Sequence, residues 1–155
     1  MAGAPNIVGG YRISWAEGTT ANTKPSDATW NPIEGAVNKL PNFFPTAEAT
    51  EYRVLDSKQA LAIPGAMPSI DGTMSIYLNT EFVKEHQKMV VSQKDPTKGN
   101  SIWLKVEFVD DKRIVYCKCQ INEKIPTPTD ESGGLFLYEF QLTNVAEPID
   151  EWTLT

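Results

Sequence analysis

Residue types that carry catalysis or bind metals are sparse in this chain, and the cysteines are the first to consider. Cys117 and Cys119 are two positions apart, so on a β-strand both side chains would lie on one face. A disulfide between such close neighbours is strained, and we expect reduced thiols in a reducing compartment. A zinc site needs about four ligands, and His86 is the only histidine. We therefore expect no metal site, and two small buried side chains at the cysteines.

Paired carboxylates are the second candidate for chemistry. Asp110-Asp111 and Asp130-Glu131 each lie in a segment that is predicted to be an exposed turn, whereas a glycosidase needs two acids in a cleft with contrasting environments. The sequence contains no phosphate-binding glycine-rich loop and no G-x-S-x-G motif. The chain has a single histidine, so only one residue could serve as the base in Ser–His or Cys–His nucleophilic catalysis. We predict that the protein is not an enzyme and binds no cofactor.

Short strands separated by turns dominate the rest of the pattern. Eleven prolines and ten glycines are scattered along the chain, which is typical of a mainly β domain. Apolar and polar residues alternate at 11–15 and 102–108, as in strands with one buried face, and 135–142 is predicted as a further strand. The last of these strands places four apolar residues on one face: Phe136, Tyr138, Phe140 and Leu142. The segment 112–121 is apolar on both faces, so it should be covered on both sides.

One helix is predicted, at about residues 80–92. Asn79 or Thr80 caps it, and Glu81 lies in the first turn, where the helix dipole favours an acid. Apolar side chains then recur at helical spacing and form a stripe that covers a sheet: Phe82, Val83, His86, Met89 and Val90. We expect His86 to pack on this stripe rather than to act in catalysis. The predicted fold class is therefore mainly β, a β-sandwich or barrel with one flanking α-helix.

Length and charge limit the organisation and the partners. The chain has 155 residues, which suits a single domain over 1–155, and we expect flexible arms at 1–10 and 143–155. The net charge is −6, and no Lys or Arg follows Lys124. Such a chain has no cluster of basic residues to grip phosphates, so we expect it to repel nucleic acid. A secretory signal and an apolar membrane-spanning window are not recognisable, which makes the cytoplasm the default address.

The segment Ala60–Ile70 is apolar and carries no charge. Pro64-Gly65 is a strong turn signal and Pro68 disfavours a central strand, so we expect a loop. Such a loop either folds over its own core or covers another subunit, and we favour the second because exposed apolar patches usually mark interfaces. The candidate docking residues are Leu61, Ile63, Pro64, Gly65, Met67 and Ile70.

The chain has a distinctive succession of segments: Trp30–Gly35, Thr50–Asp56, Ala62–Met67, the strand Met74–Leu78, the helix Phe82–Val90, the hairpin Ile102–Phe108 with Arg113–Ile121, and Tyr138–Asn144 followed by Pro148. In this order, over about residues 11–150, the chain resembles the major tail tube proteins of long-tailed, siphovirus-like bacteriophages. The similarity rests on the chain length, the single helix and the succession of segments rather than on any one motif.

The resemblance implies a structural virion protein. In that family six subunits join their sheets into a ring with a continuous inner β-barrel, and self-assembled rings stack into a tube through loops and arms. The tube conducts double-stranded DNA during ejection without binding it specifically, and its lumen is generally acidic; Glu107 and Glu139 are our candidate lumen acids. Other implied partners are the tail terminator and the tail tip or baseplate proteins. The protein would be made in the host bacterial cytoplasm and reside in the virion tail, of either the flexible or the contractile type.

An alternative function comes from another class, a monomeric β-sandwich module that binds carbohydrate. Exposed tryptophan and tyrosine faces stack on sugars. The candidates are Trp15, Trp30, Trp103 and Trp152, any of which also suits a hydrophobic core.

Overall fold

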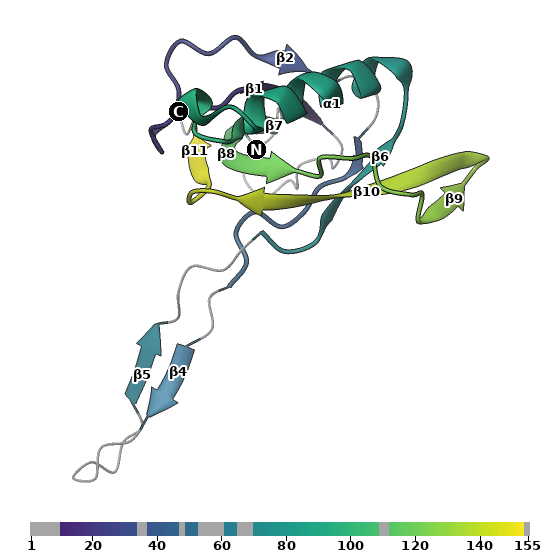
Figure 1. Cartoon of the computed structure of the whole chain (residues 1–155). Coiled ribbons are helices and arrows are strands. Elements are labelled where there is room, and N and C mark those ends of the chain that lie inside the picture. Colours follow the sequence, from purple (N-terminus) through teal and green to yellow (C-terminus); the bar gives the residue numbers. More distant parts are fainter. Residues whose placement is uncertain are drawn as a thin grey trace, which may run out of the picture.

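The computed structural model describes residues 10–33, 37–46, 49–52, 61–64, 70–108 and 112–153 (Figure 1). These residues form a curled antiparallel half-barrel sheet with one α-helix, which confirms the predicted fold class. The helix is α1 (Thr80–Gln93), and a 3₁₀ turn, η1 (Pro96–Lys98), follows it. The strands are β1 (Tyr11–Glu17), β2 (Asn31–Pro32), β3 (Val37–Lys39), β4 (Ala49–Tyr52), β5 (Leu61–Pro64), β6 (Thr73–Tyr77), β7 (Ile102–Phe108), β8 (Arg113–Ile121), β9 (Asp130–Ser132), β10 (Leu135–Asn144) and β11 (Ile149–Trp152).

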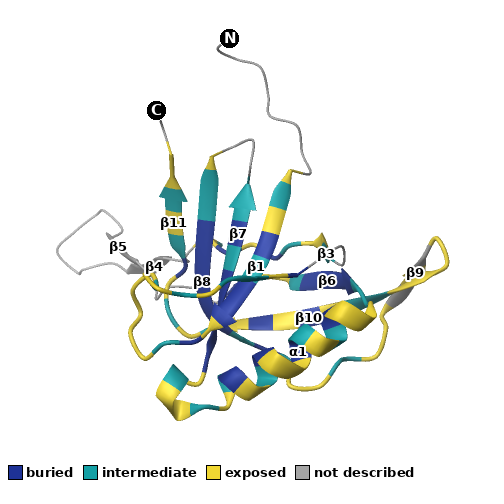
Figure 2. Cartoon of the chain, turned by 90° about the horizontal axis from the view of Figure 1, so that it is seen from above, coloured by how far each residue is buried: buried dark blue, intermediate teal, exposed yellow. Residues whose placement is uncertain are grey.

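The main sheet has the order β2-β1-β7-β8-β10-β6-β3, with β11 paired to β8 and β9 paired to β10. Two strands share the same edge of β8: β11 pairs with its first residues and β10 with its last, from Cys119 to Ile121. Beyond this short contact β10 leaves β8 and pairs with β6. Figure 2 shows the result, in which β1, β7, β8 and β11 run side by side while β10 and β6 run across them. The sheet therefore curls around one core.

The core lies on the concave side of this sheet, where the predicted alternation places the apolar side chains. Ile13 and Trp15 of β1 and Leu104 and Val106 of β7 are buried. Cys117 and Cys119 are both buried free thiols on this side. Hydrogen bonding with Cys117 and burial raise the pKa of the Cys119 thiol well above its ordinary value. The two cysteines are thus packed as small apolar side chains, in line with the prediction.

Helix α1 closes the open side of the curled sheet. Asn79 caps it by accepting a hydrogen bond from the backbone N–H of Phe82 at 2.7 Å, and Pro96 follows soon after its last turn. Phe82, His86 and Met89 are buried on the predicted stripe. His86 packs against aromatic rings, and its Nε2 lies 2.8 Å from the carbonyl oxygen of Asn122. It is a core histidine, as predicted.

The convex side of β7 and β8 is covered by the loop between β1 and β2. Trp103 and Tyr116 are buried there, with Trp30 of the loop half-buried against them. The ring centroids of Trp30 and Tyr116 are 5.9 Å apart. The strand predicted to be covered on both faces is therefore covered by its own chain, so its two-sided apolar pattern is no argument for a second subunit.

Two expectations on segments are corrected. The segment Ala60–Ile70 is not a loop throughout, because Leu61–Pro64 forms β5 and pairs with β4. The C-terminal arm, expected from residue 143, is largely part of the sheet, because β10 extends to Asn144 and β11 pairs with β8. Apolar contacts of Ile149 and ion pairing of Asp150 with Arg113 fix β11. The arm at 1–10 lies outside the described residues except for Gly10, as do Asp110 and Asp111.

Candidate assembly surfaces

The hairpin of β4 and β5 is the first surface that a second molecule could use. Its pairs run from Ala49 with Pro64 to Tyr52 with Leu61, and within the described residues neither strand joins the main sheet. In Figure 1 the hairpin stands away from the rest of the molecule. A two-stranded hairpin by itself is at best marginally stable in water. A partner surface that covers it would therefore stabilise it.

The base of this hairpin is fastened to the body. Asn42 and Asp71 form an isolated β-bridge, with N···O distances of 2.8 and 3.0 Å in the two directions. Ile70 is 4% exposed, and its backbone N–H donates to Asn144 Oδ1 at 3.1 Å. Among the docking residues expected from the sequence, Ile70 therefore lies in the core and not on a docking surface.

The remaining predicted docking residues divide into two groups. Leu61, Ile63 and Pro64 lie in β5, so the structure places them in the projecting hairpin. Gly65 and Met67 lie outside the described residues.

The second surface is the free edge of β11. Within the described residues β11 pairs with β8 alone, so its other side is an edge of the sheet. Arg113 holds this strand with two hydrogen bonds to Asp150, at 2.7 and 3.1 Å, and lies over the rings of Trp152, Phe108 and Phe44. Although burial opposes it, hydrogen bonds from Arg113 and Trp152 lower the pKa of Asp150. Contacts with Arg113 and with the aromatic rings around it therefore hold the edge strand β11 in place.

The two predicted lumen acids lie on different parts of the sheet. Glu107 of β7 pairs across the sheet with Ile114, near the start of β8, and its carboxylate is 3.2 Å from Lys105 Nζ. Glu139 is exposed on β10, opposite Ser75 of β6. Because β10 meets β8 only at its far end, the structure does not bring the two acids together.

The loop over the convex face is held by a buried lysine. Lys118 is 2% exposed, and its Nζ donates to Asn22 Oδ1 at 2.9 Å and to the carbonyl oxygens of Thr20 and Ala21. Burial lowers the pKa of Lys118. Lys24 adds an ion pair with Glu151 of β11 at 2.9 Å. The loop is consequently a fixed part of the subunit that ties β1 to β8 and β11.

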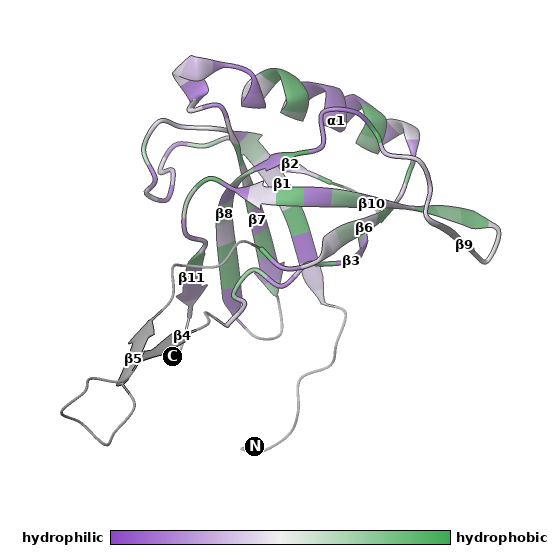
Figure 3. Cartoon of the chain, turned by 60° about the horizontal axis from the view of Figure 1, so that its bottom comes forward, coloured by the Kyte–Doolittle hydropathy of each residue, from purple (hydrophilic) through white to green (hydrophobic). Residues whose placement is uncertain are grey.

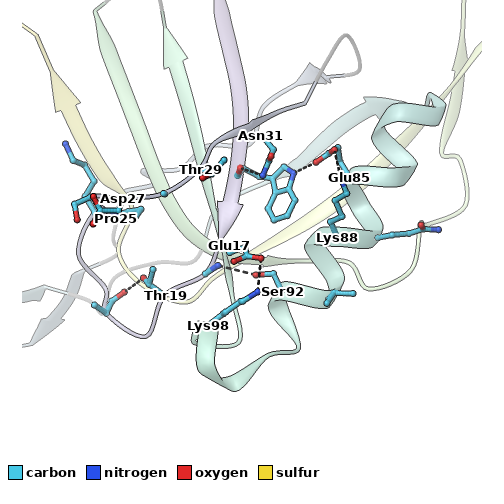
Figure 4. A pocket seen from close by; sticks show the side chains of 18 of the residues that line it. Glu17, Thr19, Pro25, Asp27, Thr29, Asn31, Glu85, Lys88, Ser92 and Lys98 are labelled. Atoms are coloured by element: carbon cyan, nitrogen blue, oxygen red, sulfur yellow. Dashed lines mark hydrogen bonds and ion pairs between the residues drawn. The ribbon is translucent and has the colours of Figure 1, made fainter.

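A groove of about 1240 Å³ separates this loop from α1 (Figure 4). Glu85 of α1 lies in it and accepts a 2.6 Å hydrogen bond from Trp15 Nε1. The exposed face of α1 forms one wall, with Lys84, Lys88 and Val91. Helical periodicity predicts this exposed face, and Gly, Thr, Asn and Ser at 17–29 predict a long loop, but the sequence gives no sign that the loop lies beside α1 and makes a groove.

The hairpin of β9 and β10 is a third surface, and sequence reasoning missed it. The sequence places Phe136 on one strand face with Phe140 and Leu142, which are buried, but Phe136 is 55% exposed, and Leu135 beside it is 57% exposed. In Figure 1 the hairpin extends past the end of the body, and in Figure 3 the start of β10 is strongly hydrophobic. The pair Asp130-Glu131 lies in β9 of this hairpin rather than in a turn. The signal in the sequence was the Gly133-Gly134 turn between an acidic and an apolar segment.

Other kinds of site find little support in the described residues. No group of three or more His, Cys, Asp or Glu within them is placed to hold a metal ion. Trp15 and Trp103 are buried and Trp30 packs on Tyr116, which leaves Trp152 as the exposed tryptophan of the described chain. The described helices include none with the length and apolar character needed to cross a membrane.

Comparison with known proteins adds no identification. A scan against models of protein families finds no match, and a search of curated proteins finds no similar sequence.

Proposed function

We propose that this protein is the building block of a tube, a structural subunit that assembles with copies of itself into stacked rings. Its proposed place is the tail of a long-tailed bacteriophage, where the tube conducts DNA into the host. The proposal rests on the sequence resemblance stated above, on two structural features, the projecting β4–β5 hairpin and the free sheet edge, and on the acidic composition.

The observation that carries the proposal is the β4–β5 hairpin. It pairs with no other described strand and stands clear of the body (Figure 1). Leu61 and Ile63 make β5 apolar in sequence, and an apolar hairpin outside its own core is favoured when another surface covers it. The bridge between Asn42 and Asp71 pairs the chain segment before the hairpin with the segment after it. This arrangement suits a contact between successive rings.

The sheet edges support ring formation. An exposed edge strand presents unpaired N–H and C=O groups, which pair readily with another chain. The edge at β11 and the edge at β2 belong to opposite sides of the sheet that contains β1, β7 and β8. Pairing of one edge with the other edge of the next copy would continue the sheet around a ring and remove both edges.

The charge distribution suits a conduit for DNA. The chain carries a net charge of −6, and a surface of the same sign as phosphate resists adhesion. Glu139 is exposed, whereas the charge of Glu107 is partly balanced by Lys105 at 3.2 Å. The two acids lie on different parts of the sheet, so a single lumen surface would contain one of them, and we favour Glu139 as the more effective.

The alternative of a carbohydrate-binding module has weaker support. Sugar platforms use exposed aromatic faces, and the described part of the chain exposes Trp152 but buries Trp15 and Trp103. Trp152 is itself engaged, since its ring lies 4.9 Å from the guanidinium carbon of Arg113 and its Nε1 donates to Asp150.

Negative-stain microscopy of the purified protein tests the proposal. The wild type should form rings or tubes without any ligand as its concentration rises. Ile63→Asp places a charge in the projecting hairpin and should abolish tube growth while circular dichroism shows an unchanged fold. Val145→Asp is the matched control, because Val145 is an exposed apolar residue outside the hairpin, and it should assemble normally. A wild-type protein that stays monomeric at every concentration, or that binds glycans as a monomer, contradicts the proposal.

A further inference from the structure

At the outer end of the β9–β10 hairpin, the apolar strand face that is buried in the core continues beyond the core. Phe136 shares its strand face with Phe140 and Leu142, which are buried, yet its side chain is 55% exposed. The reason is that the strand runs on past the edge of the body (Figures 1 and 2). An apolar face that overhangs in this way indicates a surface that another molecule covers.

An acidic side chain lies beside this phenylalanine. In the hairpin register Phe136 is directly opposite Glu131, which is exposed. Residues directly opposite in an antiparallel pair have Cβ atoms about 4.5–5.5 Å apart and lie on the same face. The hairpin therefore presents an apolar ring and a carboxylate side by side.

The groove wall on α1 presents the complementary pair at matching spacing. Val91 is 69% exposed and Lys88 is three residues before it, with a side chain that is 66% exposed. Residues three apart on a helix have Cβ atoms about 5–6 Å apart. Lys88 has a loose ion pair with Glu85 at 3.5 Å, and Glu85 keeps its hydrogen bond from Trp15 if Lys88 turns to another acid.

The hairpin is complementary to Lys88 and Val91 in particular and not to a net charge of the groove. Residues of both signs line it, and each of its lysines has an acidic neighbour within 4 Å. The groove, at about 1240 Å³, exceeds the range of about 300–1,000 Å³ that small-molecule sites occupy. The groove therefore has room for a polypeptide segment.

The hairpin cannot reach this groove in its own subunit. The hairpin tip and the C-terminal half of α1, which carries Lys88 and Val91, lie at opposite ends of the molecule (Figures 1 and 2). We infer that the β9–β10 hairpin of one copy seats in the α1 groove of the next copy, with Phe136 against Val91 and Glu131 against Lys88. This inference rests on the proposed self-assembly and names the contact that links neighbours in one ring. It is a head-to-tail contact, which generates a ring when the rotation closes.

Sedimentation velocity over a range of concentrations tests the apolar half of the contact. Phe136→Ser should raise the concentration needed for ring formation by at least about tenfold, because buried aromatic residues dominate interface energies. Leu135→Ser is the matched control, since Leu135 is equally exposed but lies on the other face of the hairpin. Its effect should stay within about twofold. Both side chains are exposed, so both variants should unfold at the wild-type temperature.

A charge exchange tests the polar half. Glu131→Lys and Lys88→Glu should each raise the concentration for ring formation by about two- to fivefold, as expected for an exposed ion pair, and the double variant should recover the wild-type value. A double variant no better than the worse single one, or equal effects of Phe136→Ser and Leu135→Ser, would overturn this contact while rings still formed. A wild type that forms no rings would instead contradict the proposed function itself, and the contact with it.

Discussion

Among the glycines of the described residues, Gly18 has the least space for a Cβ atom, and this gives a sharp prediction. Gly18 follows β1 directly and passes against the segment from Lys98 to Ser101. Its backbone N–H donates to Ser92 Oγ of α1 at 3.2 Å, and that hydroxyl donates in turn to the carbonyl oxygen of Ser101 at 3.2 Å. The crossing therefore joins β1, α1 and the start of β7. We predict that Gly18→Ala strongly destabilises the fold.

The size of the effect follows from the distances. A Cβ atom at position 18 would lie 2.1 Å from the carbonyl oxygen of Ser101 and 2.3 Å from that of Lys98, whereas ordinary contacts begin at 3.4 Å. The two backbones would have to separate by about 1 Å, which is an overpacking cost of about 1–3 kcal/mol. The separation also breaks the buried hydrogen bonds of Ser92, which costs a further ~1–3 kcal/mol. The expected loss in free energy of unfolding is about 2–6 kcal/mol, with a central value of about 4 kcal/mol.

Equilibrium unfolding in urea measures this loss. With a slope of about 2 kcal/mol per molar urea, the midpoint of Gly18→Ala should fall by about 2 M. Gly133→Ala is the control, because Gly133 has a positive φ of 59° but open space around a Cβ. It should cost only the left-handed backbone strain of about 1–2 kcal/mol. If Gly18→Ala lowered the midpoint less than Gly133→Ala, the close crossing would be refuted as a determinant of stability.

Two further predictions concern buried titratable groups. Lys118→Met removes the donor to Asn22 and should cost about 1–2 kcal/mol in free energy of unfolding at neutral pH. Because burial lowers the pKa of Lys118, the unfolded chain binds the lysine proton more tightly than the folded chain. The stability advantage of wild type over the variant should therefore grow as the pH rises towards about 10.4, the ordinary pKa of lysine. Urea unfolding of both proteins at neutral and alkaline pH checks the sign, and a constant or shrinking advantage contradicts it. Cys117 and Cys119 should not react with a disulfide reagent in the folded protein, since both are buried and the pKa of Cys119 is raised, but both should react in urea; rapid modification of the folded protein would show that this part of the core opens.

Local patterns in the sequence were sufficient for α1, for the strands β1, β6, β7, β8 and β10 and for one face of the core, but not for β5, β9 and β11. Helical spacing from Phe82 to Met89 and the cap at Asn79 defined α1, and alternation from Ile102 to Phe108 defined β7. These features depend on neighbours within a few residues, where side-chain periodicity and capping act. The packed state of His86 and of the two cysteines followed from the same faces.

Tertiary structure alone decided which surfaces remain open. The loop after Gly18 covers the second face of β8, where Lys118 of β8 binds the loop backbone and Trp30 of the loop packs on Tyr116. Lys118 and Thr20 are 98 residues apart, so no local pattern predicts this contact. Phe136 belongs by periodicity to the core face, but the body ends before β10 does, so the side chain overhangs. Whether an apolar residue is buried or offered to a partner depends on where the rest of the chain stops, and that is fixed by long-range packing rather than by the residue's own neighbours.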